Sequence, residues 1–481
     1  MGAKPVLAPI PAFPVDASVT APAWYSYFAM LAIDVTALSV VYWLAVIGRY
    51  FVTPGSLRFY IELFPGISLF VLAFFIQGLY PGLLLHPAEE IRRIFYCVSI
   101  VFLLVVCTTF LWHNASSFSR SIFLITWTLG SPAVLLARYV GRYYLARSEW
   151  WGIPAVVLGS GPVAQKIIRA LTNRRLGLRI TAVLDDFAIR AYNTALAPVP
   201  SNRALQLRTS PTVAANYAIV ALPDTPSIEL RQMLRDYCQG FHHVLLVPDM
   251  PGICSLGMTA RDIGGDVVFE VPQRLFHRSA GIVKRALDLS LSGAALVALS
   301  PLFLVLTLII RLTSPGPAFY GHARYGRGGK VFKALKFRTM VQQGDQLLAT
   351  YLEKHPEELR AWQRDQKLKN DPRVTRVGRL LRRCSLDELP QLWNVFRGQM
   401  SLVGPRPIVG VEIPKYGRGY DLYTRVLPGI TGLWQVSGRN NTTYEERVTF
   451  DEYYVRNWSI WLDAYILIRT VKTVLTAEGA Y

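Results

Sequence analysis

Long runs of apolar residues dominate the first 150 positions of the chain. Each of four runs is long enough to cross the hydrocarbon core of a bilayer, which takes about 20 helical residues. The first run begins well inside the chain and lacks a small-residue cleavage site, so we expect it to remain as a membrane span. The pattern therefore predicts four transmembrane helices within residues 1–150. They run roughly over Trp24–Ile47, Phe59–Leu85, Phe95–Trp112 and Ser121–Tyr144.

Basic residues beside these runs indicate their orientation. Arg92 and Arg93 lie in the second loop, and Arg142 and Arg147 follow the fourth run, while three other arginines lie on the opposite side. Because cytoplasmic loops carry an excess of Lys and Arg, the majority places both ends of the bundle in the cytoplasm. We expect no buried pair of carboxylates and no charged ladder in these spans, so we interpret the bundle as an anchor and not as an ion pathway.

A different pattern begins after residue 150. The apolar run Ala155–Leu158 leads into a glycine turn, Gly159–Ala164, and a helical stretch, and a second strand, Ile180–Leu184, ends at two aspartates. This order is typical of dinucleotide-binding folds, in which amides at the helix start face a pyrophosphate. Pro162 removes one of those amides, so we predict a Rossmann-like domain over residues 151–278 and leave a bound nucleotide as the alternative. Two further strands are predicted at Tyr217–Leu222 and His243–Val247.

A fifth apolar run, Leu289–Leu312, is long enough to span a bilayer but is flanked by basic residues at both ends. Both flanks therefore favour the cytoplasmic side. Ser300 and Pro301 stand at its midpoint, where proline removes a helical hydrogen bond and the residue before it disfavours helix. We predict a re-entrant hairpin over residues 284–312, with a kinked full span as the alternative.

Two other features of this region suit a membrane interface. Lys284 and Arg285, at the start of the hairpin, are candidates to meet a lipid phosphate, and the simpler interpretation is interfacial anchoring. The segment 451–475 carries spaced Tyr and Trp residues and predicts an interfacial amphipathic helix, with an ordinary core helix as the alternative.

Composition and charge narrow the class of protein. Of the 481 residues, 52% are hydrophobic and only 17% are charged, which excludes a disordered chain and argues against a wholly soluble one. The net charge is +19, and residues 281–481 hold 29 basic and 17 acidic side chains, which is +12 of that excess. An anionic partner is therefore expected there. The sequence shows no recognisable nucleic-acid module, so we expect a phosphate-bearing ligand and no nucleic acid.

Several long sequence words follow the hairpin. They are Gly316–Tyr320, Arg324–Arg327, Lys336–Met340, Asn370–Thr375, Leu381–Asn394, Met400–Pro407 and Pro428–Arg439. Together they resemble the polyprenyl-phosphate hexose-1-phosphate transferases, the bacterial sugar transferases that start glycan assembly. The resemblance covers residues 281–481 nearly without gaps, and the preceding spans and nucleotide-fold domain match the large form of that family.

The resemblance implies a reaction and a pair of catalytic residues. It implies transfer of a sugar-1-phosphate from a UDP-sugar to undecaprenyl phosphate with release of UMP, the first membrane step of O-antigen or exopolysaccharide synthesis. It assigns Asp387 as the nucleophile that forms an aspartyl-phosphosugar, and Glu388 as the ligand of Mg²⁺. Members that use UDP-galactose are the most similar, through words such as Tyr320–His322 and Arg406–Val409, and UDP-glucose is the alternative.

Cations near this acidic pair suit a diphosphate, because arginine binds phosphate oxygens bidentately and a positive field keeps a nearby aspartate ionised. The candidate phosphate-binding residues are Lys336, Arg338, Arg382, Arg383 and Arg406.

The acidic pair also has a purely structural interpretation. Ser385 and Glu388 have the spacing of a helix capping box. That helix would place Pro390 at its fifth position, where the missing N–H is normally bonded. A helix that starts at Leu386 or Asp387 would instead tolerate this proline in its first turn.

The predicted fold class is a membrane α-helical bundle in residues 1–150, an α/β Rossmann-like domain in 151–278 and a mixed α/β monotopic catalytic domain with a re-entrant membrane helix in 279–481. We expect a homodimer in the bacterial inner membrane with its catalytic domain on the cytoplasmic face. Its partners are expected to be a UDP-sugar, undecaprenyl phosphate and membrane lipid. The competing class is a non-catalytic UDP-sugar-binding regulator of polysaccharide export.

Overall fold

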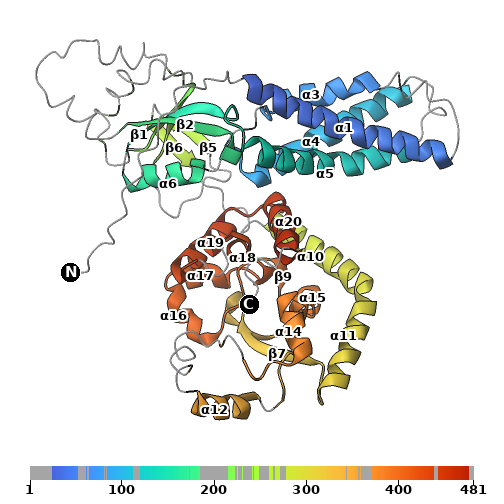
Figure 1. Ribbon diagram of the computed structural model, residues 1–481, viewed down its shortest axis with the longest axis vertical. Coiled ribbons are helices and arrows are strands. Elements are labelled where there is room, and N and C mark those ends of the chain that lie inside the picture. The colour runs from blue at the N-terminus through green and yellow to red at the C-terminus, as the bar shows by residue number, and fades with distance from the viewer. Residues whose placement is uncertain are drawn as a thin grey trace, which may run out of the picture. The chain divides into compact units, whose positions relative to one another are not determined.

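Figure 1 shows the computed structural model of the chain, which forms two compact units, Met1–Pro251 and Gly252–Tyr481. Apart from a few isolated positions, the structure describes residues 24–52, 64–80, 84–111, 120–159, 161–172, 174–184, 215–222, 243–248, 259–263, 266–270, 278–342, 344–355, 371–437 and 442–475.

Apolar helices form the first part of the first unit, and Figure 1 shows them side by side. Within the described part of this region, three helices are long and apolar enough to cross a membrane: α1 (Trp24–Val52), α4 (Pro87–Leu111) and α5 (Arg120–Leu145). The remaining predicted span contains a shorter apolar helix, Phe64–Ile76, which comprises the 3₁₀ turn η1 (Phe64–Gly66) and α3 (Ile67–Ile76). Three of the four predicted spans are thus confirmed by length and composition, and the fourth stays a prediction.

A buried ion network joins three of these helices and corrects the expectation that the bundle lacks buried carboxylates. Arg138 on α5 is 1% exposed and donates to both carboxylate oxygens of Asp34 on α1, at 2.8 and 2.6 Å. It also donates to Glu90 on α4 at 2.8 Å, and Arg142 binds the same carboxylate at 2.8 Å. Two cations balance two anions, so the network crosslinks the bundle without a net charge.

Arg138→Met should destabilise this unit by about 3 to 5 kcal/mol, because it leaves two buried carboxylates with too little counter-charge. Arg147→Met, which removes an exposed arginine just beyond α5, is the matched control and should have little effect. Thermal unfolding of the detergent-solubilised protein measures both. A variant that also carries Asp34→Asn and Glu90→Gln should recover much of the loss. Equal unfolding midpoints for the Arg138→Met and Arg147→Met proteins would contradict a structural role for the network.

A parallel sheet forms the second part of the first unit, as predicted. Its strands are β1 (Ile153–Leu158), β2 (Leu178–Leu184), β3 (Tyr217–Val220) and β4 (His243–Leu246), in the order β2-β1-β3-β4, and all neighbours pair in parallel. The interior strand β1 is buried along its whole length, as expected for a strand that packs on both faces.

The glycine turn after β1 has a clear steric reason. Gly159 has a φ of +122°, and a Cβ there would lie 2.6 Å from the carbonyl oxygen of Ala221. Pro162 is the first residue of helix α6 (Pro162–Thr172), where a missing N–H costs no helical hydrogen bond. The two aspartates predicted to end β2 lie outside the described residues.

The second unit begins with a hairpin of β5 (Thr259–Ile263) and β6 (Asp266–Glu270), followed by two apolar helices. Helix α10 (Arg278–Ala298) and helix α11 (Ser300–Thr313) meet at a bend of 60° and lie along one side of this unit (Figure 1). The break falls at Leu299, directly before Ser300 and Pro301, where the sequence predicts an interruption of the helix. The Ser300 hydroxyl donates a hydrogen bond to the Val297 carbonyl at 2.8 Å, so this polar group is satisfied at the bend.

The remaining elements are short and pack around an antiparallel pair, β7 and β8. Two three-residue strands, β9 and β10, form a parallel pair. The bounds are β7 Phe319–Tyr325, β8 Val331–Phe337, α12 Gly344–Lys354, α14 Arg376–Arg383, η7 Leu386–Glu388, α15 Gln391–Phe396, β9 Ser401–Val403, η8 Gly410–Glu412, α16 Ile413–Tyr416, α17 Gly419–Thr424, β10 Gly429–Thr431, α18 Leu433–Ser437, α19 Tyr444–Arg456 and α20 Ile460–Leu475.

The C-terminal helices differ from the interfacial segment predicted for residues 451–475. Tyr454 and Trp458 are 1% and 4% exposed, and Leu462 and Ile466 are fully buried. The Tyr454 hydroxyl hydrogen-bonds to the Val403 carbonyl at 2.9 Å. The core alternative therefore holds for Tyr454 and Trp458, whereas Ile468 and Val471 of α20 are 56% and 60% exposed, and an interfacial role for that helix stays a prediction.

Candidate active site

The acidic pair Asp387–Glu388 lies in the 3₁₀ turn η7, between α14 and α15. Ser385 before it adopts a left-handed conformation, with φ 56° and ψ 19°, and its side chain makes no capping hydrogen bond. The capping-box interpretation is therefore wrong. Pro390 instead directly precedes α15 as its N-cap, where the missing N–H is not needed for the helix. The tight turn presents two consecutive carboxylates at one place.

Apolar residues on both sides of the pair fix this turn to the bent helices. Leu386 and Leu389 pack against a buried cluster that contains Leu306 and Ile310 of α11 and Phe337 of β8. Burial of such side chains stabilises by about 1.5 to 3 kcal/mol each. The carboxylates are thus anchored to the second of the two apolar helices and not to a surface loop.

Lys336, at the end of β8, is the main counter-ion of the pair. Its ammonium lies 2.6 Å from Glu388 Oε1. Burial acts to raise the pKa of Glu388, but Lys336 and then Arg406 outweigh it and hold this pKa below its usual range. Asp387 is 9% exposed, and burial raises its pKa although Lys336 opposes the shift. The two carboxylates therefore differ. The charged form of Glu388 is stabilised by the nearby cations, whereas the charged form of Asp387 is disfavoured by burial.

A small pocket lies directly beside Glu388. Lys336 and Arg406, two of the predicted phosphate-binding residues, line it, and their role toward phosphate stays a prediction. Its volume of about 20 Å³ holds roughly one water. Three polar lining residues were not among the predicted site residues: Arg324, Gln391 and Gln435. All three stand within the sequence words of the family, which was the available signal.

The loop that carries Arg406 is held by backbone contacts on both sides. The Gly404 amide donates to Thr431 at 2.9 Å, the Gly429 amide donates to Pro405 at 2.8 Å, and Tyr325 donates to Ile408 at 2.9 Å. A Cβ on Gly404 would lie 2.7 Å from the Leu427 carbonyl oxygen, so this close approach requires glycine. The guanidinium lies 5.8 Å from the centroid of the Trp434 ring. Arg406 is therefore a preorganised cation.

The other predicted phosphate-binding residues have different surroundings. Arg382 donates to Thr339 Oγ1 at 3.0 Å and acts to lower the pKa of Asp387, so it lies near the pair. Arg383 is exposed on α14. Arg338 donates to the carbonyls of Ser314 and Pro315, at 2.6 and 2.7 Å, and so closes the end of α11. The structure thus brings Lys336 and Arg406 to the pocket and gives Arg338 a structural contact.

The two cations predicted to meet a lipid phosphate are both engaged in the protein. Lys284 forms an ion pair with Asp463 at 2.7 Å. Arg285 donates to the carbonyls of Val395 and Phe396, both at 2.7 Å. These carbonyls end α15, so Arg285 caps the helix that follows the acidic pair. Their contacts tie α10 to the rest of the unit, and a role toward lipid phosphate stays a prediction.

The donor set at the pair suits Mg²⁺. This ion is usually bound by one or two carboxylates, with waters and substrate phosphates as the other ligands. Glu388 is held as an anion, and Asp387 is adjacent to it. Among the residues that the structure describes, no group of three or more His, Cys, Asp or Glu side chains is placed to hold a metal. The phosphates of a substrate would therefore have to complete the coordination.

Asp451 is a buried carboxyl that interacts electrostatically with Arg406 and makes the stability of the fold depend on pH. Asp451 is 3% exposed and contacts the Tyr416 hydroxyl at 2.7 Å, and burial raises its pKa to about 8. An unfolded aspartate has a pKa of about 3.9. Between about pH 4 and 8 the unfolded chain therefore loses this proton while the folded protein keeps it, so the free energy of unfolding falls as pH rises through this range and levels off above about 8.

Asp451→Asn should therefore raise the unfolding temperature relative to the native protein by an amount that grows from pH 5 to pH 8.5. Asp421→Asn, at an exposed carboxylate on α17, is the control and should show no such trend. Unfolding midpoints across this pH range provide the measurement. A difference that does not change with pH would contradict a buried, neutral Asp451.

Comparison with known proteins identifies the family. Residues 279–477 match the bacterial sugar transferase family, and residues 76–248 match a CoA-binding domain. The chain is 37% identical over 400 residues to the undecaprenyl-phosphate galactose phosphotransferase of Salmonella typhimurium, which covers 82% of each chain. The chain belongs to the bacterial sugar transferase family.

Two further relatives help to describe this sugar transferase. An uncharacterized sugar transferase of Haemophilus influenzae is 38% identical over 368 residues, which is 76% of this chain and 78% of the relative. A UDP-glucose:undecaprenyl-phosphate glucose-1-phosphate transferase of Klebsiella pneumoniae is 32% identical over 314 residues, 64% of each chain. The family and the large form, with a CoA-binding domain before the transferase domain, are thus confirmed.

Proposed function

We propose that this sugar transferase moves galactose-1-phosphate from UDP-galactose to undecaprenyl phosphate, with release of UMP, through a covalent intermediate on Asp387. The observation that carries the proposal is the pocket in which Lys336 and Arg406 meet Glu388, with the buried Asp387 beside it. Family membership supports the reaction class. Galactose is favoured over glucose because the relative named for galactose aligns over a larger share of the chain.

In the first half-reaction, an Asp387 carboxylate oxygen attacks the phosphorus that bears the sugar. The bond from this phosphorus to the bridging oxygen breaks, and UMP leaves with that oxygen and its electron pair. Lys336 and Arg406 face the negative charge that develops on the phosphoryl oxygens and the leaving group. Bound Mg²⁺ would offset further phosphate charge, with Glu388 as its protein ligand.

In the second half-reaction, an oxygen of undecaprenyl phosphate attacks the acyl phosphate. The bond between phosphorus and the Asp387 oxygen breaks, so the carboxylate is restored and the lipid gains a diphosphate-linked sugar. No proton transfer is required, because the lipid phosphate is already largely anionic near neutral pH. The contact of Leu386 and Leu389 with α11 supports a site that meets a membrane substrate.

Release of UMP from purified full-length protein tests the reaction and the sugar together. With Mg²⁺ and undecaprenyl phosphate, UDP-galactose should yield UMP faster than UDP-glucose at equal concentration. The alternative class, a UDP-sugar-binding regulator, predicts binding without UMP. Faster release from UDP-glucose would contradict the choice of sugar but not the reaction.

We also propose that α10 and α11 form a re-entrant hairpin with both ends on the cytoplasmic face of the inner membrane. The bend of 60° at Ser300 supports this topology. In a cysteine-free background, a cysteine at Leu312 should resist a membrane-impermeant maleimide applied to intact cells and react after permeabilisation. Labelling of that cysteine from the periplasmic side would contradict the hairpin and favour a kinked span.

A further inference from the structure

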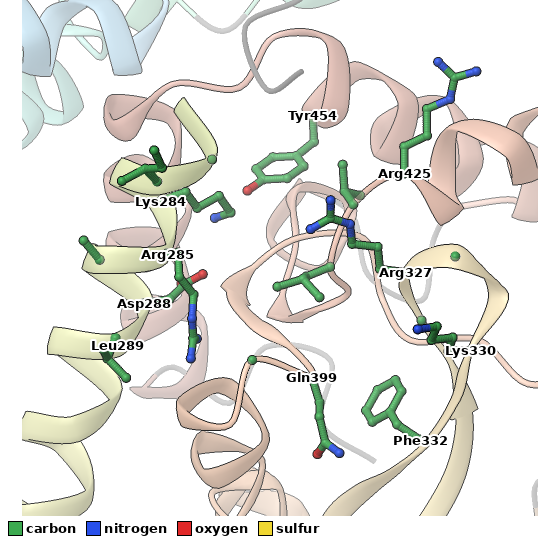
Figure 2. A pocket seen from close by; sticks show the side chains of 18 of the residues that line it. Lys284, Arg285, Asp288, Leu289, Arg327, Lys330, Phe332, Gln399, Arg425 and Tyr454 are labelled. Atoms are coloured by element: carbon green, nitrogen blue, oxygen red, sulfur yellow. The ribbon is translucent and has the colours of Figure 1, made fainter. Parts of the chain in front are cut away.

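A second and larger cavity lies between the first half of α10 and the turn that joins β7 to β8. Its volume is about 1310 Å³, and Figure 2 shows its lining from close by. It shares no lining residue with the pocket beside Glu388. Strand β8 contributes to both: Val331 and Phe332 line the cavity, and Ala334 and Lys336 line the pocket. The nearest of these positions, Phe332 and Ala334, are two residues apart, which is about 7 Å along a strand.

The charge of the cavity is strongly positive. Five cationic side chains line it and only one carboxylate, Asp288, which accepts a hydrogen bond from the Leu402 amide at 3.0 Å. Three of the cations already have partners within the protein. They are Lys284, Arg285 and Arg425, which bind Asp463, two carbonyls and Asp421. The field of the cavity therefore suits an anion.

Arg327 and Lys330 are the two cations left for a ligand. Neither makes a side-chain hydrogen bond or ion pair within the part of the chain that the structure describes. Arg327 begins a tight turn and Lys330 follows it. The two glycines between them, Gly328 and Gly329, have φ of +68° and +69°. Glycine takes this conformation without steric cost, so the turn holds both cations at one rim. In Figure 2 the Arg327 guanidinium points into the same space as the Lys284 ammonium.

The rest of the cavity is apolar and lies beside a helix of membrane-compatible composition. Phe332, Val426 and Leu427 line it opposite α10. On α10, Ile282 and Leu289 also line it and are 70% and 41% exposed. Because α10 and α11 together are long and apolar enough for a membrane segment, exposed apolar residues on α10 suit acyl chains. A soluble anion would gain nothing from this apolar surface.

We propose that this cavity binds an anionic phospholipid of the surrounding membrane. The lipid phosphate binds Arg327 and Lys330, and an acyl chain lies against Ile282 and Leu289. A phospholipid suits both parts of the cavity, because its anionic headgroup meets the cationic rim and its acyl chain meets the apolar wall. The acceptor lipid of the reaction is a poorer fit, because the lining contains neither carboxylate of the acidic pair.

The test uses the full chain in nanodiscs that contain equal amounts of phosphatidylglycerol and phosphatidylethanolamine, followed by native mass spectrometry of retained lipid. The native protein should retain phosphatidylglycerol in preference, and less of it at high salt. Arg327→Gln with Lys330→Gln should lower the apparent affinity for phosphatidylglycerol by about tenfold or more. Lys354→Gln with Arg418→Gln is the control, since both residues are exposed cations of the same unit outside the cavity.

Three results would overturn the proposal. One is equal retention of the two phospholipids by the native protein, a readout that does not depend on how any variant folds. Another is an equal loss of affinity in both double variants, which would indicate a general charge effect. The third is displacement of phosphatidylglycerol by undecaprenyl phosphate at a stoichiometric amount, which would assign the cavity to the acceptor lipid. Release of UMP is measured separately, so failure of this proposal is distinguishable from failure of the proposed reaction.

Discussion

Asp387→Asn should lower kcat by at least about 10⁴-fold, because an amide oxygen cannot form the acyl phosphate. Substrate binding should change little, since the three cations of the pocket, Arg324, Lys336 and Arg406, remain. UMP release under saturating UDP-galactose measures the loss of turnover. Titration of UDP-galactose monitored by protein fluorescence measures binding.

Asp421→Asn is the control for this change and should keep full turnover, because Asp421 is an exposed carboxylate paired with Arg425 on α17. The unfolding temperature of the Asp387→Asn protein should equal or exceed that of the native one, since a desolvated carboxylate is removed. If Asp387→Asn keeps more than a tenth of native turnover, Asp387 does not act as the nucleophile.

Lys336→Gln should lower kcat by about 10² to 10³-fold, the usual effect of removing one preorganised group that stabilises developing charge. It should also move the acid limb of the pH–rate profile to higher pH. Lys336 opposes the burial that raises the pKa of Asp387, and it holds the pKa of Glu388 down. Without the ammonium both pKa values rise, so both carboxylates lose their charge at a higher pH than in the native protein.

Lys333→Gln is the matched control for Lys336→Gln. Lys333 lies on the same strand, and its substitution removes the same charge. Its side chain faces the opposite side of the strand, because side chains alternate along a strand. Its profile should overlay that of the native enzyme. A uniform loss of rate in Lys336→Gln without a shift of the acid limb would show that Lys336 binds phosphate but does not set the ionisation of the pair.

Much of the fold was predictable because its signals are local. The four parallel strands follow apolar runs that end at turn residues, and the bend between α10 and α11 follows from the effect of Pro301 on its own helix. The acidic pair and two of its cations, Lys336 and Arg406, were predictable from family words. In each case the cause lies within a few residues of its effect.

The rest depends on contacts between distant residues. Nothing near Arg285 in sequence shows that it caps α15, more than 100 positions later. The ion network needs Asp34, Glu90 and Arg138 from three separate helices, so the sequence of any one span suggests an isolated charge. Tyr454 and Trp458 have the composition of an interface but are buried, and their polar atoms bind Val403 of β9 and Asp463 of α20.

The left-handed conformation of Ser385 was also outside local prediction, since serine adopts it only where the surrounding structure holds it there. Here α14 ends and η7 begins within two residues, and the apolar anchors on α11 and β8 define both. The capping-box pattern predicts a regular helix at this position. Tertiary packing instead produces the tight turn that places Glu388 at the pocket and the buried Asp387 next to it in sequence.

The covalent intermediate is tested most directly by mass spectrometry of the intact full-length protein and of its peptides. The protein is incubated with UDP-galactose and Mg²⁺ in the absence of undecaprenyl phosphate, then quenched. The account predicts a hexose-phosphate adduct on the peptide that contains Asp387, formed with one UMP per adduct and lost on addition of undecaprenyl phosphate. The Asp387→Asn protein should form no adduct. An active enzyme that releases UMP only when the acceptor lipid is present, with no adduct on that peptide, would contradict the covalent route and indicate a single displacement.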